Sequence, residues 1–144
     1  MKILMVCLGN ICRSPLAEGI LQKLAVEKSL PWQISSAGTG NWHVGQAPDH
    51  RSIAAAKEKG YDISKQRAKH FNATMFVDYD LIFAMDKNNF KDLLGLATSK
   101  NETEKIKPFL ITGDVTDPYF DDKLFAPVAE QIEIRCAEII KEFS

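Results

Sequence analysis

One stretch near the N-terminus decides the fold: Val6-Cys7-Leu8-Gly9-Asn10-Ile11-Cys12-Arg13-Ser14-Pro15. It follows an apolar run that begins at Ile3 and precedes a helical pattern that begins near Pro15, so it predicts a strand, a loop and a helix in succession. Gly9 and Asn10 tolerate left-handed backbone angles, which allow a loop to turn successive N–H groups inward. Such a nest of amides at the positive end of a helix predicts an anion-binding site.

The side chains of this loop predict what it does with the anion. Amide dipoles and a guanidinium stabilise the thiolate form of a cysteine, so Cys7 is predicted to be a nucleophile. Arg13 presents a planar, permanently charged fork that can bind two phosphate oxygens. Ser14 can donate a hydrogen bond to the sulfur and help to cap the helix, whose first position suits Pro15. The spacing Cys-x5-Arg-Ser therefore predicts a thiol-dependent phosphatase.

The residues of the loop allow two other interpretations, a packing cysteine and a nucleotide-binding loop. A cysteine at the end of a strand is often a packing residue, and this alternative stays open for Cys7. A Walker-type nucleotide loop requires Gly-Lys-Ser/Thr, and this loop contains no lysine, so nucleotide hydrolysis is disfavoured. We expect Asn10 to fix the loop backbone through its side chain. The expected phosphate-binding and supporting residues are Leu8, Gly9, Asn10, Ile11, Cys12, Arg13 and Ser14.

Composition restricts the classes of function. The chain has 144 residues, 45% of them hydrophobic, which predicts a single domain over residues 1–144 with a sizeable core. A net charge of −1 gives no overall attraction to nucleic acid or to an anionic membrane. Without a run of about 18 apolar residues or a signal-peptide pattern, we expect a cytoplasmic protein. Three cysteines at no zinc spacing predict reduced thiols and no metal site.

Strand and helix patterns alternate along the chain. Strands are predicted at 2–8, 33–37, 79–85 and 106–111, helices at 15–30, 53–59, 72–78, 87–96 and 128–143, and a surface loop at 97–105. Alternation implies parallel pairing, so we predict a three-layer α/β/α fold with an open four-stranded parallel sheet and the phosphate-binding loop between its first strand and helix. Pro108 assigns the last strand to an edge. Ligands of such sheets bind beyond the carboxyl ends of the strands.

The predicted chemistry also needs an acid, because a thiolate can attack phosphorus but cannot protonate the departing oxygen. Asp86 and Asp117 both follow predicted strands on this edge of the sheet. Pro118 biases Asp117 toward an extended loop that can reach over the pocket, which favours Asp117. Trp42, in a glycine-rich loop, is either a wall that stacks on a substrate ring or an anchor that packs on the core.

At these residues the chain resembles the low-molecular-weight protein tyrosine phosphatases, over nearly its whole length. Besides the Cys7 loop, the matching motifs are Ser36-Ala37-Gly38-Thr39, Trp42-His43-Val44-Gly45, Pro48-Asp49-His50-Arg51, Met85-Asp86 and Asp117-Pro118-Tyr119-Phe120. The resemblance implies phosphotyrosine hydrolysis through a cysteinyl phosphate, without a cofactor, catalysed by Cys7, Arg13 and Asp117. It also implies that Trp42, Tyr119 and Phe120 flank the substrate pocket. Gln66 departs from the family, since many relatives have a histidine there.

The resemblance leaves the substrate class open to alternatives. Relatives divide between phosphotyrosine and phosphoarginine, and a branched apolar residue at the position of Ile11 resembles the phosphotyrosine type. The expected substrates are therefore phosphotyrosine-containing proteins or peptides, and the expected product is inorganic phosphate. We also expect the enzyme to be a monomer. A protein arginine phosphatase is one alternative. Another is an arsenate-reductase-like relay, for which only Cys12 is left because Cys136 lies on the apolar face of the last predicted helix.

A further alternative is a redox sensor or a phosphopeptide-binding module without catalysis. Cys7 and Cys12 stand at opposite ends of a tight loop, where a reversible disulfide could protect an oxidised nucleophile. Packing of Cys12 beneath the loop is the competing interpretation. A pure binder needs neither a nucleophile nor an acid, so the presence of both Cys7 and Asp117 favours an enzyme.

Overall fold

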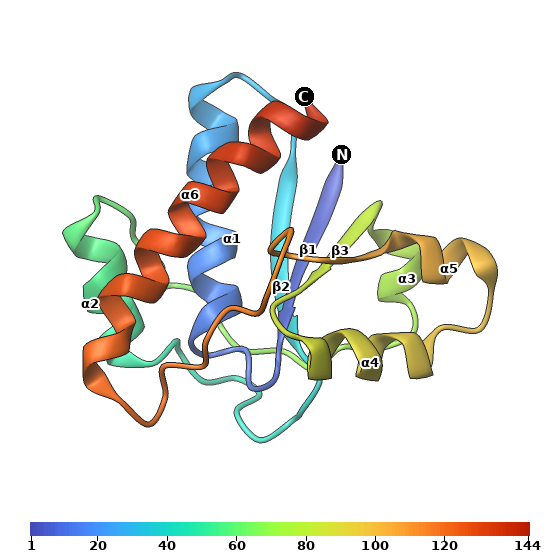
Figure 1. The fold of residues 1–144 in the computed structure, drawn as a ribbon, viewed down its shortest axis with the longest axis horizontal. Helices are drawn as coiled ribbons and strands as arrows, with labels where there is room; N and C mark the ends of the chain where they lie inside the picture. The colour runs from blue at the N-terminus through green and yellow to red at the C-terminus, as the bar shows by residue number, and fades with distance from the viewer.

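Four parallel strands form the centre of the fold, in a computed structural model that describes residues 1–144 (Figure 1). They are β1 (Lys2–Cys7), β2 (Gln33–Gly38), β3 (Leu81–Ala84) and β4 (Ile106–Pro108), and they pair in the order β2-β1-β3-β4. Apart from Lys2, all of β1 is buried, because a strand flanks it on each side and helices cover both faces. The predicted open four-stranded parallel sheet is confirmed.

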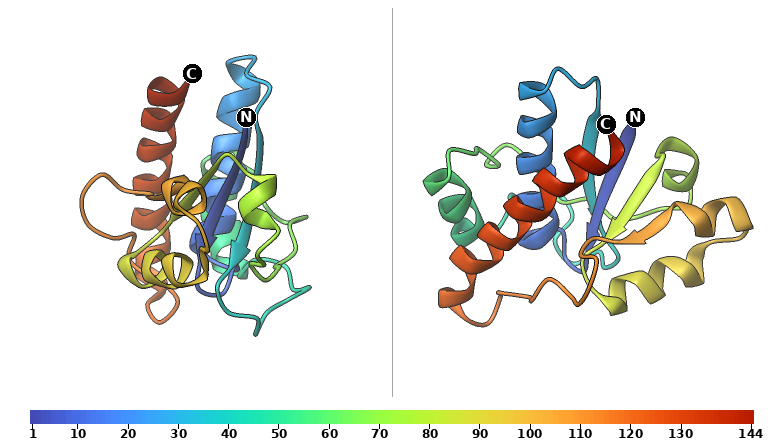
Figure 2. Two further views of the ribbon diagram at one scale, coloured as in Figure 1. Left: turned by 90° about the vertical axis from the view of Figure 1, so that its right-hand side faces the viewer. Right: turned by 45° about the horizontal axis from the view of Figure 1, so that its top comes forward.

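Alternate residues of β1 serve two separate cores. Ile3 and Met5 pack with the buried sides of α1 and α6, whereas Leu4 and Val6 pack with residues of α3 and α4. The helices are α1 (Arg13–Glu27), α2 (His50–Glu58), α3 (Met75–Asp78), α4 (Lys87–Leu96), α5 (Lys100–Lys105) and α6 (Phe125–Phe143). Figures 1 and 2 show α1, α2 and α6 on one side of the sheet and the other three helices on the opposite side. This arrangement is the predicted three-layer architecture.

The strand order fixes where a ligand can bind. The chain leaves β1 toward β2 on one side and later returns to β3 on the other, so the direction of strand addition reverses at β1. Crevices at such a reversal, beyond the carboxyl ends of the strands, are the usual ligand sites of open α/β sheets. The loop after β1 lies there, at the end of the molecule remote from both termini (Figure 1).

The prediction of a surface loop over 97–105 is wrong, because residues 100–105 form helix α5. This helix has no buried residue, so it carries no apolar face that periodicity could reveal. Its start is set instead by side chains: Ser99 Oγ accepts a hydrogen bond from the Glu102 amide, and the Glu102 carboxylate accepts one from the Thr98 amide.

Helix α1 begins two residues earlier than predicted, at Arg13. Pro15 is therefore the third helical residue, which is tolerated because amides of the first turn have no helical acceptor. Ser14 lies inside the helix and makes no capping hydrogen bond, so its predicted capping role is wrong. Its hydroxyl contacts Cys7 instead.

Other predicted boundaries shift by a few residues. Strands β3 and β4 are shorter than 79–85 and 106–111, and α3 is shorter than 72–78. Helix α2 starts at His50, three residues before the predicted 53, because the Asp49 carboxylate caps it by accepting from the Arg51 amide. Strand β4 lies at the edge of the sheet, as Pro108 predicted, and Cys136 is in the core. No helix of the chain is both long and apolar enough to cross a membrane.

Candidate active site

The loop between β1 and α1 turns its backbone amides toward its own centre. The carbonyls of Cys7 and Leu8 accept hydrogen bonds from Thr39 and Gly40 (3.0 and 2.9 Å), and that of Ile11 accepts from Asp49 (2.8 Å). In a trans peptide the next N–H points opposite to the carbonyl, so the following amides face inward. The amides of residues 8–12 donate to no protein group. Neighbouring amides without a protein acceptor can bind an acceptor-rich ligand such as an anion.

The sulfur of Cys7 ends a chain of hydrogen bonds with a defined direction. Asn10 Nδ2 donates to Ser14 Oγ (2.8 Å) and to Ser36 Oγ (2.9 Å), which uses both of its protons. Ser14 therefore directs its own proton to Cys7 Sγ, 3.0 Å away, and Ser36 directs its proton to Glu18 Oε1 at 2.6 Å. A hydroxyl that donates to sulfur stabilises the thiolate.

Asn10 also sets the shape of the loop. Its φ of 57° is left-handed, and its side-chain oxygen accepts from the Lys69 amide at 2.9 Å. A Cβ on Gly38 would stand 2.8 Å from the Leu8 carbonyl, so the neighbouring strand must be glycine where the loop passes it. The side chain of Asn10 therefore links the loop to α1, to β2 and to the backbone at Lys69, and makes no hydrogen bond to the backbone of the loop itself.

Arg13 lines the same pocket as Cys7, and one edge of its guanidinium is already hydrogen-bonded. Nη1 donates to Asp86 Oδ2 (2.7 Å) and to the Val115 carbonyl (2.9 Å), while Nε and Nη2 make no hydrogen bond. The free edge can therefore receive a phosphate. Burial disfavours the charge of this side chain, but its attraction to the Cys7 thiolate and to Asp86 outweighs burial and raises the pKa of Arg13. Arg13 is therefore positively charged at physiological pH.

Cys12 occupies the far end of the loop and has a different environment from Cys7. Burial, together with the negative charge of Asp49, raises the pKa of Cys12 to about 12. Its thiol is therefore neutral at physiological pH. Cys7 and Cys12 are both free thiols in this structure, and so is Cys136.

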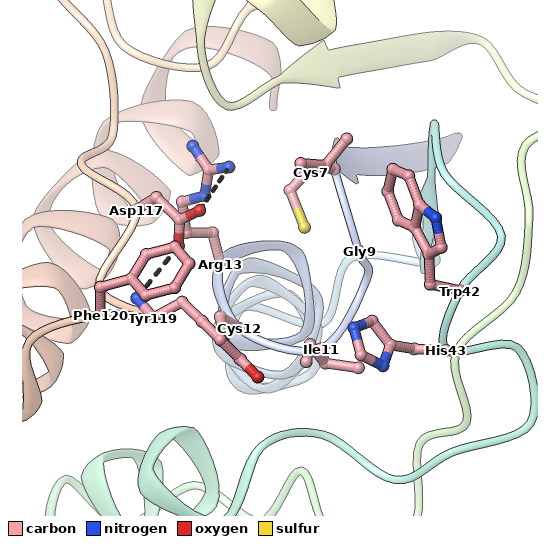
Figure 3. Close-up of a pocket in the computed structure, with 11 residues that line it drawn as sticks. Cys7, Gly9, Ile11, Cys12, Arg13, Trp42, His43, Asp117, Tyr119 and Phe120 are labelled. Carbon is pink, nitrogen blue, oxygen red and sulfur yellow. Dashed lines mark hydrogen bonds and ion pairs between the residues drawn. The ribbon is translucent and has the colours of Figure 1, made fainter.

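Asp117 lies in the loop between β4 and α6 and faces the pocket from the side opposite Trp42 (Figure 3). Its Oδ1 accepts a hydrogen bond from the Tyr119 amide (3.1 Å), and its Oδ2 is 3.9 Å from Arg13 Nη2. The side chain is 44% exposed, so it can exchange protons with water. Asp86, the rival on topology, instead binds Arg13 and caps α4 by accepting from the Asn89 amide.

Aromatic side chains form two walls of the pocket, which encloses about 210 Å³. Trp42 lies on one wall and Tyr119 and Phe120 on the other, with the Cys7 sulfur between them (Figure 3). The Trp42 ring is 66% exposed and covers Gly40, where a Cβ would stand 2.0 Å from a ring carbon. It is therefore not an anchor in the core. Phe120 is 92% exposed and free to contact a ligand.

Two contacts at or next to the pocket were not predicted from the sequence: the pairing of Asp86 with Arg13, since Asp86 was considered only as an acid, and the position of His43 in the pocket. Asp86 binds Arg13 across 73 positions, a pairing that only the parallel neighbours β1 and β3 create. His43 lines the pocket beside Trp42 and lies against Gly9, where a Cβ would be 3.2 Å from its ring. Its adjacency to the predicted wall was the available signal. Gln66 lies outside the pocket and donates to the Pro15 carbonyl.

Comparison with known proteins gives a consistent picture. Residues 2–144 match the family model described as low molecular weight phosphotyrosine protein phosphatase. A low molecular weight protein-tyrosine-phosphatase of Bacillus subtilis is 36% identical over 96% of this chain and 93% of its own, and the human low molecular weight phosphotyrosine protein phosphatase is 33% identical over 98% and 94%. The structure of a protein tyrosine phosphatase from Entamoeba histolytica superposes with a TM-score of 0.92, at 34% identity over 99% of this chain and 96% of the other.

Proposed function

The chain belongs to the low molecular weight phosphotyrosine protein phosphatase family, and we propose that Cys7, Arg13 and Asp117 are the residues through which it hydrolyses phosphotyrosine. It is an enzyme, a protein-tyrosine-phosphatase of the hydrolase class. The expected product is inorganic phosphate, and the reaction needs no cofactor. We further propose a monomeric, cytoplasmic enzyme whose single domain covers residues 1–144.

In the first step the Cys7 thiolate attacks phosphorus and an S–P bond forms while the P–O bond to the tyrosine ring breaks. The inward amides of residues 8–12 and the free edge of Arg13 hold the three equatorial oxygens, where negative charge is spread. Asp117 gives its proton to the departing phenolate oxygen. The products of this step are tyrosine and a cysteinyl phosphate.

In the second step water attacks the cysteinyl phosphate. Asp117, now a carboxylate, accepts the proton of this water, and the S–P bond breaks to give inorganic phosphate and the Cys7 thiolate. The hydroxyl of Ser14, 3.0 Å from the sulfur, stabilises the departing thiolate. Asp117 is thereby reprotonated, and the enzyme returns to its starting state.

One observation carries this assignment: the amides of residues 8–12 donate to no protein group, and their loop lines one pocket with Cys7. A cysteine that only packs in the core does not require such a run of amides without protein acceptors beside it. The aromatic walls made by Trp42, Tyr119 and Phe120 fit an aryl substrate, since stacked rings contribute about 0.5–1.5 kcal/mol beyond area burial. Ile11 also lines the pocket, and its branched apolar side chain resembles the phosphotyrosine type of relative rather than the phosphoarginine type.

The test is turnover of two peptides of identical sequence that carry phosphotyrosine or phosphoarginine, with the reduced enzyme in metal-free buffer. We expect kcat/KM for phosphotyrosine to be larger by about tenfold or more. The variant Ile11→Thr should narrow this preference, and Ile11→Val, which stays branched and apolar, serves as the matched control. A preference for phosphoarginine would overturn the substrate assignment but keep the mechanism. Turnover of neither peptide would overturn the catalytic assignment itself.

A further inference from the structure

The side chain of Arg51 connects two loops of the pocket. One is the phosphate loop, residues 8–12 between β1 and α1, and the other is the loop that carries Asp117. Arg51 is the second residue of α2, and its Nε and Nη2 donate to the two oxygens of Asp49 (3.0 and 2.9 Å). Asp49 itself is fixed, because its carboxylate caps α2 and its amide donates to the Ile11 carbonyl at 2.8 Å. The Ser52 hydroxyl adds a hydrogen bond to the Cys12 carbonyl (3.3 Å). The guanidinium is thus held in a fixed position relative to the phosphate loop.

The other side of the guanidinium faces the segment that follows Asp117. Nη1 donates to Asp122 Oδ1 at 2.6 Å. The guanidinium carbon lies 5.4 Å from the centre of the Tyr119 ring and 4.5 Å from that of the Phe125 ring, within the range of a cation–π contact. Arg51 therefore contacts the segment 117–125 near its beginning, its middle and its end.

The Asp117 loop, residues 116–124, has few other attachments. Most of its residues are exposed, and Pro118 is the one that is buried. Its polar side-chain contacts with the rest of the chain are two: Asp122 with Arg51, and Asp117 with Arg13 at 3.9 Å. Tyr119 also donates its backbone amide to the Asp117 carboxylate, so a displacement of the backbone at Tyr119 moves the hydrogen bond that orients this carboxylate.

The energetic balance favours a positioning effect over a large effect on stability. An exposed ion pair such as Arg51 with Asp122 contributes little to folding, because solvent screens it and two side chains lose freedom. Here Asp49 has already ordered the guanidinium, so its contacts with Asp122 and the two rings cost little additional entropy. A displacement of about 1 Å in a catalytic group can cost up to about 100-fold in rate.

We propose that Arg51 is a positioning residue for general-acid catalysis: it holds the Asp117 loop over the pocket through Tyr119, Asp122 and Phe125. The inference rests on the proposed role of Asp117 as the acid. It predicts that the loss of Arg51 lowers proton delivery to the leaving group and leaves phosphate binding unchanged. A merely structural role for Arg51 would lower both.

The experiment compares kcat/KM for phenyl phosphate, whose leaving phenolate is strongly basic, with that for 4-nitrophenyl phosphate, whose leaving group needs little protonation. Arg51→Gln should lose about tenfold with phenyl phosphate and about twofold with the nitrophenyl ester. The inhibition constant of inorganic phosphate should stay within about twofold of the wild-type value. Asp122→Asn, which keeps Arg51 and its bonds to Asp49, should show the same selective loss at about threefold.

Two controls separate this inference from the proposed function on which it rests. Lys59→Gln breaks a comparable ion pair between the end of α2 and Glu133 of α6 (3.1 Å), away from the Asp117 loop, and should affect the two esters equally. In an Asp117→Asn background, Arg51→Gln should have no further leaving-group effect. Equal losses with both esters, or an undiminished effect in that background, would overturn the positioning role. If Asp117→Asn itself shows no leaving-group selectivity, the acid assignment fails instead.

Discussion

The phosphate loop and the Asp117 loop meet at the same pocket but are built in opposite ways. The first is mostly buried and bonded to its neighbours: Asn10 and Arg13 are each 3% exposed, and the carbonyls of Cys7, Leu8 and Ile11 are all hydrogen-bonded to neighbouring segments. The second is exposed and touches the rest of the chain through a few side chains. One part of the site is rigid and the other is lightly held.

This difference indicates that the two loops have separate roles: one stabilises the phosphoryl group and the other delivers the proton. Stabilising the charge of a phosphoryl group requires dipoles that are already oriented, and a buried loop with satisfied carbonyls provides them. Delivering a proton requires a carboxylate that exchanges with water and reaches substrates of different size, which an exposed loop provides. Changes in the phosphate loop should therefore abolish or weaken every reaction, whereas changes in the Asp117 loop should depend on the leaving group.

The largest expected effect comes from Cys7→Ser, which removes the nucleophile from the rigid half. A serine hydroxyl at this position is not ionised, so kcat should fall by about 10⁴-fold or more. Phosphate affinity, measured by calorimetry, should remain near that of the wild type, since the amides and Arg13 are unchanged. Appreciable remaining turnover would contradict the nucleophile assignment.

The next effect comes from Asp117→Asn, which removes the acid from the lightly held half. We expect kcat/KM for phosphotyrosine peptides to fall by about 10²-fold to 10⁴-fold, with phosphate affinity retained. The matched control is Asp114→Asn, an exposed carboxylate between β4 and Asp117 that accepts from the Lys87 amide. Equal losses in the two variants would show that the charge of the loop, and not proton transfer, is what matters.

A smaller effect on rate, but a clear one on stability, is expected from Asn10→Ala. It removes three hydrogen bonds: the Lys69 amide loses its acceptor, and the Ser14 and Ser36 hydroxyls lose the donor that fixes their direction, so the free energy of unfolding should fall by about 2–3 kcal/mol. Activity should fall to the same degree with phenyl phosphate and 4-nitrophenyl phosphate. Asn41→Ala, at an exposed asparagine, should change neither quantity. A selective loss of activity with phenyl phosphate would contradict the claim that changes in the phosphate loop do not depend on the leaving group.

The smallest effect tests the far end of the hydrogen-bond chain from Cys7. Burial raises the pKa of Glu18, against the opposing Ser36 hydrogen bond and the charge of Lys69. A raised carboxyl pKa stabilises the fold below about 4.5, and this contribution is lost as the pH rises through the folded-state value. Over that window the Tm of Glu18→Gln should rise relative to wild type, by no more than about 4 °C. Glu27→Gln, exposed on the same helix, should show no such trend; a falling difference would contradict the pKa direction.

The sequence predicts the phosphate loop better than the contacts that support it, for a physical reason. Cys7, Asn10, Arg13 and Ser14 lie within eight positions, so their spacing alone determines which groups share the loop. Asp86 with Arg13 and Arg51 with Asp122 pair across 73 and 71 positions, and only the packed sheet and helices bring them together. The apolar helices follow from periodicity.

The errors in the predicted fold have the same origin. Helix α5 has no buried face, and its only signal was the Ser99-x-x-Glu102 pattern that caps it. The start of α1 shifted because the phosphate loop winds directly into the helix, so that Ser14 serves Cys7 rather than the helix end. Local sequence rules locate a helix, but the function of the preceding loop decides its first residue.

The most direct test of the account is to trap the covalent intermediate that joins the two loops in one reaction. Wild-type enzyme is mixed with a phosphotyrosine peptide, quenched with acid within milliseconds, and its intact mass and peptide map are recorded. We expect one added phosphoryl group, located on Cys7, which accumulates further in Asp117→Asn if hydrolysis slows more than attack. Full turnover without any phosphoryl group on Cys7 would contradict it.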